Sequence, residues 1–184
     1  KLKNNYLYQM ILISLFAALA AVSGYIFVPI PFSPVPITAQ TLVVMLAGNL
    51  LKPKSAFYSM VIFLLLGIAG LPVFAGGSSG ISAVLGPRGG YLISWPISAY
   101  FISYMLYRYT PTFFSIFVFD IIGGILLVYS IGALYLSYIT KISLKSAVVS
   151  GVLPFIFGDI VKALAASLIS LKIYKVMGNY SERR

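Results

Sequence analysis

Residues 147–171 read AVVSGVLPFIFGDIVKALAASLISL, an apolar run long enough to cross the hydrocarbon core of a membrane as one helix. Two charged side chains, Asp159 and Lys162, interrupt this run. A charge at the centre of a spanning helix costs about 2.5–3.5 kcal/mol on insertion scales, and such residues are functional by default. Because positions i and i+3 share one helix face, the two side chains can pair. The sequence therefore predicts either a binding site here or an ion pair that fastens two helices together.

The composition of the whole chain places it in a lipid bilayer. Of its 184 residues, 60% are hydrophobic and 9% are charged, whereas a soluble domain carries about 25% charged residues. The apolar runs are continuous rather than alternating, which favours helices over a β-barrel. We therefore expect an all-α integral membrane protein with a single membrane domain over residues 1–184.

Two residue types that serve many active sites are absent. The chain has no Cys and no His, which removes thiolate nucleophiles, His general bases and the usual zinc ligands. We expect no enzyme, no metal site and no cofactor, although a Ser–Lys dyad remains formally possible. The net charge of +10 would suggest nucleic acid in a soluble protein. Here Lys and Arg are expected to mark cytoplasmic helix ends instead, so no nucleic-acid partner is expected.

Six segments are predicted to span the membrane, and the basic residues orient them. The segments are residues 6–28, 37–51, 55–70, 89–107, 113–139 and 147–171. The first could be read as a signal peptide, but its apolar run is long for one. With the N-terminus inside, more basic residues fall in the cytoplasm than outside, which predicts that both termini are cytoplasmic. The cytoplasmic set is Lys1, Lys3, Lys52, Lys54, Arg108, Lys172, Lys175, Arg183 and Arg184, and the external set is Arg88, Lys141 and Lys145.

This topology places two loops rich in Pro and Gly, at residues 29–36 and 70–90, outside the membrane. The second is long for a connector, and loops of that length are often lids or binding loops. Its glycines, Gly76 and Gly77 among them, allow backbone to approach a ligand closely. The alternative is a flexible loop without function. With the outer half of the sixth segment, the two loops can form one outward-facing cavity.

Three local sequences, taken in order, resemble one known family. They are PIPFSPVPITAQTL at residues 29–42, GLPVFAGG at 70–77 followed by LGPRGGY at 85–91, and LPFIFGDIVK at 153–162. Together they resemble the BioY family, the biotin-binding S components of energy-coupling factor (ECF) vitamin transporters, over nearly the whole chain. The resemblance implies the six-helix S-component fold in the plasma membrane of a prokaryote. It also implies biotin capture from outside, and delivery with a transmembrane coupling subunit and two cytoplasmic ATPase subunits that use ATP.

A biotin site would be mostly apolar with a few placed polar groups. Biotin offers a ureido group with two N–H donors and one C=O acceptor, and a carboxylate tail. Asp159 only accepts hydrogen bonds when ionised and suits the ureido N–H groups. Lys162 can donate to the ureido oxygen or the carboxylate, and it keeps Asp159 charged. Gln40 can donate and accept, although a hydrogen bond between helices is an alternative role for it.

The walls of this site are expected to come from aromatic residues and the long loop. Tyr91 and the backbone of Gly76 and Gly77 can close the external side. Phe74 and Trp95 can supply apolar walls. For these three aromatic residues, anchoring at the membrane interface is the alternative.

The chain departs from the family's usual pattern at two positions. Arg88 stands where the family commonly has Thr, and Phe157 stands where it commonly has Pro. Arg88 could add an anion contact at the mouth of the pocket, or it could be a solvated loop charge. Phe157 changes the local helix geometry and puts the fine detail of the pocket in doubt.

Two further features concern the bundle itself. The S-component resemblance implies that Ala17 and Ala21, small residues four apart on the first helix, dock the coupling subunit. Packing within this protein is the alternative. Asp120 in the fifth segment has no basic partner nearby in the sequence. We expect it to form a hydrogen bond within the bundle or to be protonated, and to lie outside the biotin site.

One alternative function remains open at this point. The chain could be a stand-alone secondary carrier for biotin or another small anion, with Asp159 and Lys162 as the coupling pair. Many such carriers contain inverted repeats and interrupted helices in matching halves, and no repeat is visible here. Uptake by cells that lack ATPase partners would favour the carrier.

Overall fold

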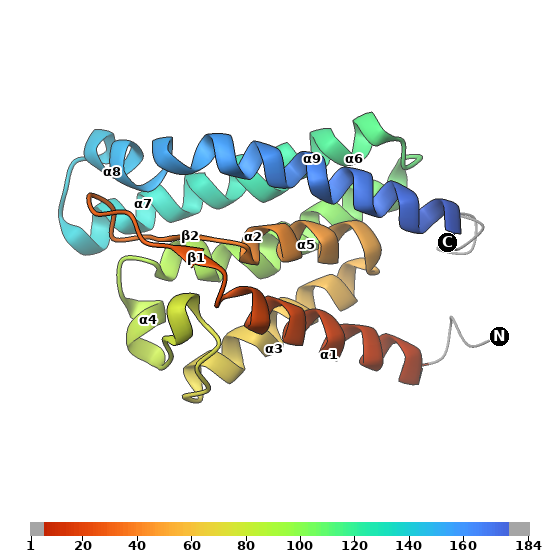
Figure 1. The fold of residues 1–184 in the computed structure, drawn as a ribbon, viewed down its shortest axis with the longest axis horizontal. Coiled ribbons are helices and arrows are strands. Elements are labelled where there is room, and N and C mark those ends of the chain that lie inside the picture. The colour runs from red at the N-terminus through yellow and green to blue at the C-terminus, as the bar shows by residue number, and fades with distance from the viewer. Residues whose placement is uncertain (1–5, 177–184) are drawn as a thin grey trace.

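The computed structural model describes residues 6–176 and shows helices that run roughly along one long axis (Figure 1). The terminal basic residues of the charge count, Lys1, Lys3, Arg183 and Arg184, lie outside the described residues. The long helices are α1 (Tyr6–Ser23), α2 (Gln40–Leu50), α3 (Pro53–Ile68), α5 (Gly89–Arg108), α7 (Val128–Thr140) and α9 (Leu153–Val176). The shorter elements are β1 (Phe27–Val28), β2 (Ile37–Thr38), η2 (Ala75–Gly77), α4 (Ile81–Leu85), α6 (Phe113–Phe119), η3 (Asp120–Leu127) and α8 (Leu144–Gly151).

Local sequence explains several helix boundaries. Pro53 begins α3 in the first turn, where its missing N–H costs nothing. Thr112 and Ser115 form a capping box at the start of α6. From α6 the helix continues through the π-helical segment η3 into α7 as one apolar span, Phe113–Thr140.

The irregular segments gather at one end of the bundle. There β1 and β2 form a short antiparallel hairpin, pairing Phe27 with Thr38 and Val28 with Ile37. The short helices α4 and α8 lie at the same end, whereas α1 begins and α9 ends at the opposite end (Figure 1). The two loops predicted to be external therefore lie together at one end.

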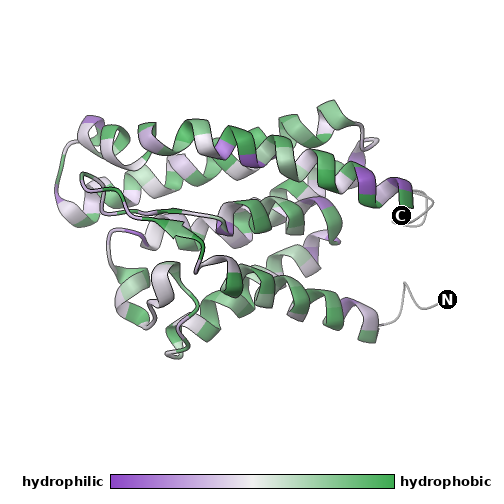
Figure 2. Ribbon diagram, viewed as in Figure 1, coloured by the Kyte–Doolittle hydropathy of each residue, from purple (hydrophilic) through white to green (hydrophobic). Residues whose placement is uncertain are grey.

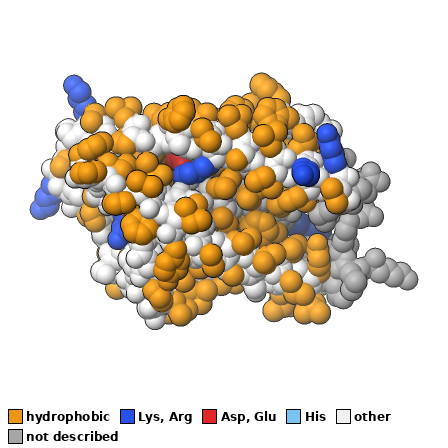
Figure 3. Space-filling view, in the orientation of Figure 1, with side chains coloured by type: hydrophobic (Ala, Val, Ile, Leu, Met, Phe, Trp, Pro, Cys, Tyr) orange, Lys and Arg blue, Asp and Glu red, His pale blue; other side chains and the backbone are white. Residues whose placement is uncertain are grey.

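The surface of the bundle is that of a membrane protein. Figure 2 shows hydrophobic residues along most of each helix, with a hydrophilic band that interrupts α9 near its middle. Figure 3 shows hydrophobic side chains over much of the face in view, basic side chains toward both ends, and one basic side chain beside an acidic one between them. Three described helices are long and apolar enough to span a membrane, namely Tyr6–Ser23, Phe113–Thr140 and Leu153–Val176. The count of six spans and the cytoplasmic placement of both termini stay predictions.

Three predicted spans differ in outline from the helices observed. The segment predicted over residues 37–51 begins as β2, and its helix α2 starts only at Gln40. The helix predicted over residues 6–28 ends at Ser23, because the chain turns there into the hairpin. The segment predicted over 147–171 is divided into α8 and α9 at Val152. Pro154 explains the division, since proline is tolerated in the first turn of a helix but not in its interior.

Helix α5 occupies the centre of the bundle, packed against α2, α3, α7 and η3. Glycines allow this close packing. A Cβ at Gly123 of η3 would lie 2.5 Å from the Ile102 side chain, and one at Gly48 of α2 would lie 2.7 Å from it. Ile102 is completely buried between these helices. This close packing fixes α2 and η3 relative to α5, and both carry residues discussed below.

Candidate ligand-binding site

The predicted pairing of Asp159 and Lys162 is confirmed. Lys162 Nζ lies 2.8 Å from Asp159 Oδ1, on the stretch of α9 where both face the bundle. Asp159 is 4% exposed, so its charge needs partners. It has three: Lys162 Nζ and Thr41 Oγ1, at 3.0 Å, donate to Oδ1, and Tyr129 OH donates to Oδ2 at 2.6 Å.

Lys162 connects α9 to the hairpin and to α2. Its ammonium group donates to the Thr38 carbonyl at 2.6 Å, to Thr41 Oγ1 at 3.0 Å and to Asp159 Oδ1. An ammonium group has three N–H donors, so all of them are used. Lys162 therefore orients the Asp159 carboxylate and attaches the strand β2 to α9.

The two side chains besides Lys162 that donate to Asp159, from Thr41 and Tyr129, were not among the predicted site residues. Thr41 lies in the first quoted sequence, one residue after Gln40, on the α2 turn that faces α9. Tyr129 lies on α7, 30 residues from Asp159 along the chain. No local spacing relates these residues to Asp159, so only the fold reveals them.

The network forms one side of a pair of adjoining hollows near the hairpin. The inner hollow has a volume of about 50 Å³ and is lined by Asp159, Lys162, Thr41 and Tyr129 among others. The outer hollow has a volume of about 40 Å³. Both are lined by Val35, Pro36, Thr38, Tyr91 and Trp95. Each hollow holds at most a few water molecules.

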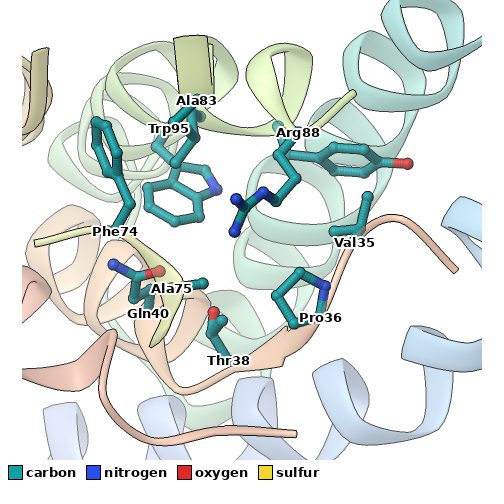
Figure 4. A pocket seen from close by; sticks show the side chains of 11 residues that line it. Val35, Pro36, Thr38, Gln40, Phe74, Ala75, Ala83, Arg88 and Trp95 are labelled. Atoms are coloured by element: carbon teal, nitrogen blue, oxygen red, sulfur yellow. The ribbon is translucent and has the colours of Figure 1, made fainter. Parts of the chain in front are cut away.

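The outer hollow contains a second polar set, consisting of Arg88, Trp95 and Gln40 (Figure 4). The Arg88 guanidinium and the Trp95 indole nitrogen point into the same space (Figure 4). The Trp95 N–H is buried and has no hydrogen-bond partner in the described part of the chain. Arg88 has no acidic partner among the described residues. Cationic and N–H donors without partners are suited to an anionic or carbonyl oxygen.

Gln40 serves both the bundle and the hollow. Its Nε2 donates to the carbonyls of Ala20 and Val73, each at 3.1 Å, and so connects α1 to the long loop. Because both partners are acceptors, the nitrogen must face them and the amide oxygen must face away. That oxygen points toward the hollow (Figure 4). Gln40 therefore forms the interhelical hydrogen bond that was its alternative role, and its amide oxygen remains as an acceptor at the hollow.

Aromatic residues fix the walls. Phe63 lies between Phe74 and Trp95, with ring centroids 5.5 and 5.7 Å away. Phe74 and Trp95 are 1% and 4% exposed, so neither anchors the protein at a membrane surface. Tyr91 OH donates to the Gly151 carbonyl at 2.7 Å, which joins α5 to the end of α8.

The two glycines of the long loop, Gly76 and Gly77, were also predicted to contribute to the site. Gly76 and Gly77 do not line either hollow, whereas their neighbour Ala75 lines the outer one. Both glycines have positive φ, 67° and 75°, and Gly76 N–H donates to the Gly24 carbonyl at 2.9 Å. They turn the loop and attach it to the end of α1. As expected, Asp120 is absent from both linings.

The predicted docking pair requires a correction. Ala17 is 2% exposed and packs in the core, and Ala21 is partly buried. The exposed small residues of α1 are Ser14 and Ala18 instead. The burial of Ala17 fits the alternative, packing within this protein, which the sequence could not distinguish because α1 is apolar on all sides.

A larger hollow of about 550 Å³ lies between α7 and the α8–α9 pair. Its lining is apolar apart from Tyr129 and Ser130. Ligand sites carry a few convergent polar groups, and the small hollows have them. We therefore place the candidate site at the small hollows.

The fold and this candidate site define a small helical membrane protein with buried polar groups beneath a hairpin at one end. The BioY family profile matches residues 2–179. Biotin transporter BioY2 of Lactococcus lactis is 35% identical over 97% of this chain and 96% of its own length. The probable biotin transporter BioY of Bacillus subtilis is 39% identical over 93% and 92%. The chain belongs to the BioY family, as the three quoted sequences predicted.

A solved structure supports the same assignment. The crystal structure of the S-component for biotin from an ECF-type ABC transporter matches with a TM-score of 0.88 and 32% identity, covering 94% of each chain. The fold of this chain is therefore that of an ECF S-component, as predicted.

Proposed function

We propose that this protein captures biotin at the hairpin end and delivers it across the plasma membrane as the S component of an ATP-driven ECF transporter. The names of its relatives support the ligand and the partners. One observation of the structure carries the proposal. The inner hollow is lined by the Asp159 carboxylate, and the outer hollow is lined by the Arg88 cation and by the buried Trp95 N–H, which has no hydrogen-bond partner in the described part of the chain.

The ureido group belongs in the inner hollow. A carboxylate has about four acceptor positions, and three at Asp159 are occupied, two on Oδ1 and one on Oδ2. The fourth, on Oδ2, is left for a ureido N–H. Lys162 has no spare N–H, so it donates to the ureido oxygen only if it releases the Thr38 carbonyl. The bicyclic ring then lies against Tyr91 and Trp95, which line both hollows.

The carboxylate tail belongs in the outer hollow. Arg88 and the Trp95 N–H supply a cation and a donor without partners there (Figure 4). Hydrogen bonds to charged groups contribute about 1.5–3 kcal/mol. This orientation leaves neither end of the ligand with like charges opposite it.

The hairpin is the proposed entry point. Hollows of about 40 and 50 Å³ are well below the roughly 300 Å³ of the smallest usual ligand pockets. Val35, Pro36 and Thr38 line both of them. The bond between Lys162 and the Thr38 carbonyl is the contact that a ligand would displace as the hairpin opens.

Calorimetric titration of the detergent-purified protein with biotin tests the proposal. We expect saturable binding of one biotin per chain, accompanied by a fluorescence change from Trp95, the only Trp in the chain. Asp159→Asn should weaken binding at least tenfold, because an amide presents N–H groups to ureido donors. Asp120→Asn is the matched control, since it makes the same change in the same bundle outside the hollows. Near-wild-type affinity of Asp159→Asn would remove its assigned role.

A thermodynamic cycle that changes both the ligand and Arg88 tests the orientation of biotin in the site. We expect biotin methyl ester to bind about tenfold more weakly than biotin to the wild type, and Arg88→Gln to remove most of that difference. A difference that persists in Arg88→Gln would place the carboxylate elsewhere.

The proposed S component and a stand-alone carrier differ in their energy source, because only the S component depends on ATP hydrolysis by partner subunits. We expect biotin uptake in cells that produce this chain together with an ECF coupling subunit and its ATPases, and none when an ATPase Walker lysine is replaced. Uptake that is unchanged by that replacement would favour the carrier.

A further inference from the structure

A second polar layer crosses the bundle about two helical turns from the ligand site, toward the end where α9 finishes. It is built on the same segments as the first. Asn49 follows Thr41 on α2, Ser167 follows Asp159 on α9, and Asp120 precedes Tyr129 along the η3–α7 span. Asn49, Asp120 and Ser167 are each 0% exposed. The first layer, at the ligand site, contains Lys162 beside its carboxylate, and this second layer contains no basic residue among the described ones.

Not every polar atom of the second layer has a hydrogen-bond partner. Asn49 Nδ2 donates to Asp120 Oδ2 at 3.0 Å. Ser167 Oγ lies 3.4 Å from the same oxygen, but 2.7 Å from the Ala163 carbonyl. A hydroxyl has one proton, and the shorter contact takes it. Asp120 therefore receives one good hydrogen bond.

Two acceptor atoms in this layer have no partner. Asp120 Oδ1 and Asn49 Oδ1 are both buried without a hydrogen bond in the described part of the chain. A buried acceptor without a hydrogen bond costs free energy, and an ionised Asp120 would add the cost of an unpaired buried charge. A proton on Asp120 Oδ1 that is donated to Asn49 Oδ1 would neutralise the acid and give both oxygens a partner.

The charged and titratable groups on the surrounding elements do not reach Asp120. On α9, Lys162 is engaged at the ligand site, Tyr174 donates to the Asn49 carbonyl, and Lys172 and Lys175 are exposed. On α7, Tyr129 donates to Asp159. On α5, Arg108 lies over the Tyr104 ring. Helices α2 and α6 carry no Lys, Arg, Asp, Glu or Tyr.

We propose that Asp120 and Asn49 form a proton-binding site, in which Asp120 is a neutral carboxylic acid that donates from Oδ1 to Asn49 Oδ1. With the bond from Asn49 Nδ2 to Asp120 Oδ2, the acid and the amide close a ring of two hydrogen bonds. The ring joins α2 to η3 beside α9 without any counter-cation. The site lies outside both hollows, so it does not depend on the identity of the ligand.

The chain is favourable for a spectroscopic test because it has only three acidic residues. Infrared spectra of the full-length protein in detergent at pH 7, in H₂O and in D₂O, report protonated carboxyl groups. We expect one C=O band of a protonated carboxyl that shifts in D₂O. It should remain in Asp159→Asn and in Glu182→Gln and disappear in Asp120→Asn. Absence of the band in the wild type, or its persistence in Asp120→Asn, would overturn the proposal.

A second measurement leaves Asp120 in place, so that an isotope label rather than a substitution identifies the protonated group. In Asp159→Asn, Asp120 is the only aspartate left, so labelling with ¹³C-carboxyl aspartate marks it alone. We expect the label to lower the frequency of the protonated band, and an unshifted band would assign the proton elsewhere. A melting temperature that rises with Na⁺ in the wild type but not in Asp120→Asn would place a cation in the layer, and would also refute the proton.

Discussion

Tyr129 shows how one hydroxyl controls the proposed site. Its OH is 2.6 Å from Asp159 Oδ2, the oxygen that retains a free acceptor position. Tyr129→Phe leaves a nearly buried carboxylate with one fewer donor, at a cost of about 1.5–3 kcal/mol for a bond to a charged group. We expect biotin affinity measured by calorimetry to fall roughly 10- to 100-fold.

Tyr135→Phe is the control for this prediction. Tyr135 lies on the same helix, and its OH donates to the Val84 carbonyl at 3.1 Å, away from Asp159. We expect its biotin affinity to stay within about threefold of the wild type. Equal affinities for the two variants would mean that Tyr129 does not orient Asp159.

Residue type and short-range spacing predicted part of the site, and the fold supplied the rest. The pairing of Asp159 with Lys162 follows from a separation of i and i+3 on one helix. Thr41 is 118 residues from Asp159 along the chain, so no periodicity could associate them. The burial of Ala17 was equally hidden, because an apolar helix in a membrane does not show which face is inside.

At the scale of elements, a hydrogen bond attaches the junction between α8 and α9 to α5. Tyr91 reaches across from α5 to the Gly151 carbonyl, and a Cβ at Gly151 would lie 2.8 Å from Leu136 and closer still to the Tyr91 oxygen. Gly151→Ala should therefore force the junction apart. Overpacking of this kind costs about 1–3 kcal/mol, and we expect a melting temperature several degrees lower in detergent, with weaker biotin binding.

Gly158→Ala provides the comparison, because a Cβ at Gly158 meets no atom within 4 Å. It lies on α9 beside Asp159. Ala is preferred over Gly inside a helix by about 1 kcal/mol, so we expect a melting temperature equal to or above that of the wild type. A loss of stability as large as that of Gly151→Ala would show that the junction has no special sensitivity.

The hairpin and the helix break are the elements that sequence patterns described least well. Continuous apolar composition predicted long uniform spans at residues 6–28 and 147–171. Composition reports that a segment is buried in lipid, but backbone direction depends on a few residues. Pro154 and the hydrogen bond from Gln40 to the Ala20 carbonyl influence the backbone direction locally, although the segments around them are uniformly apolar.

At the scale of the whole molecule, the ligand site and the proposed partner contact occupy different parts. Both hollows lie near the hairpin, whereas α1 packs mainly against α3 and α2 and leaves a long face uncovered. Leu7, Ile11, Leu15 and Val22 are exposed on that face, with the small residues Ser14 and Ala18 among them. Small residues allow another helix to approach closely, so this face suits the coupling subunit.

Ala18→Trp therefore separates capture from assembly. A large side chain on this face should keep a partner helix at a distance while leaving the hollows intact. We expect biotin affinity within about threefold of the wild type, and at least a tenfold loss of co-purification with the coupling subunit and ATPases. Leu134→Trp is the control, since Leu134 is 59% exposed on α7; we expect it to retain assembly. Normal co-purification of Ala18→Trp would move the coupling contact away from α1.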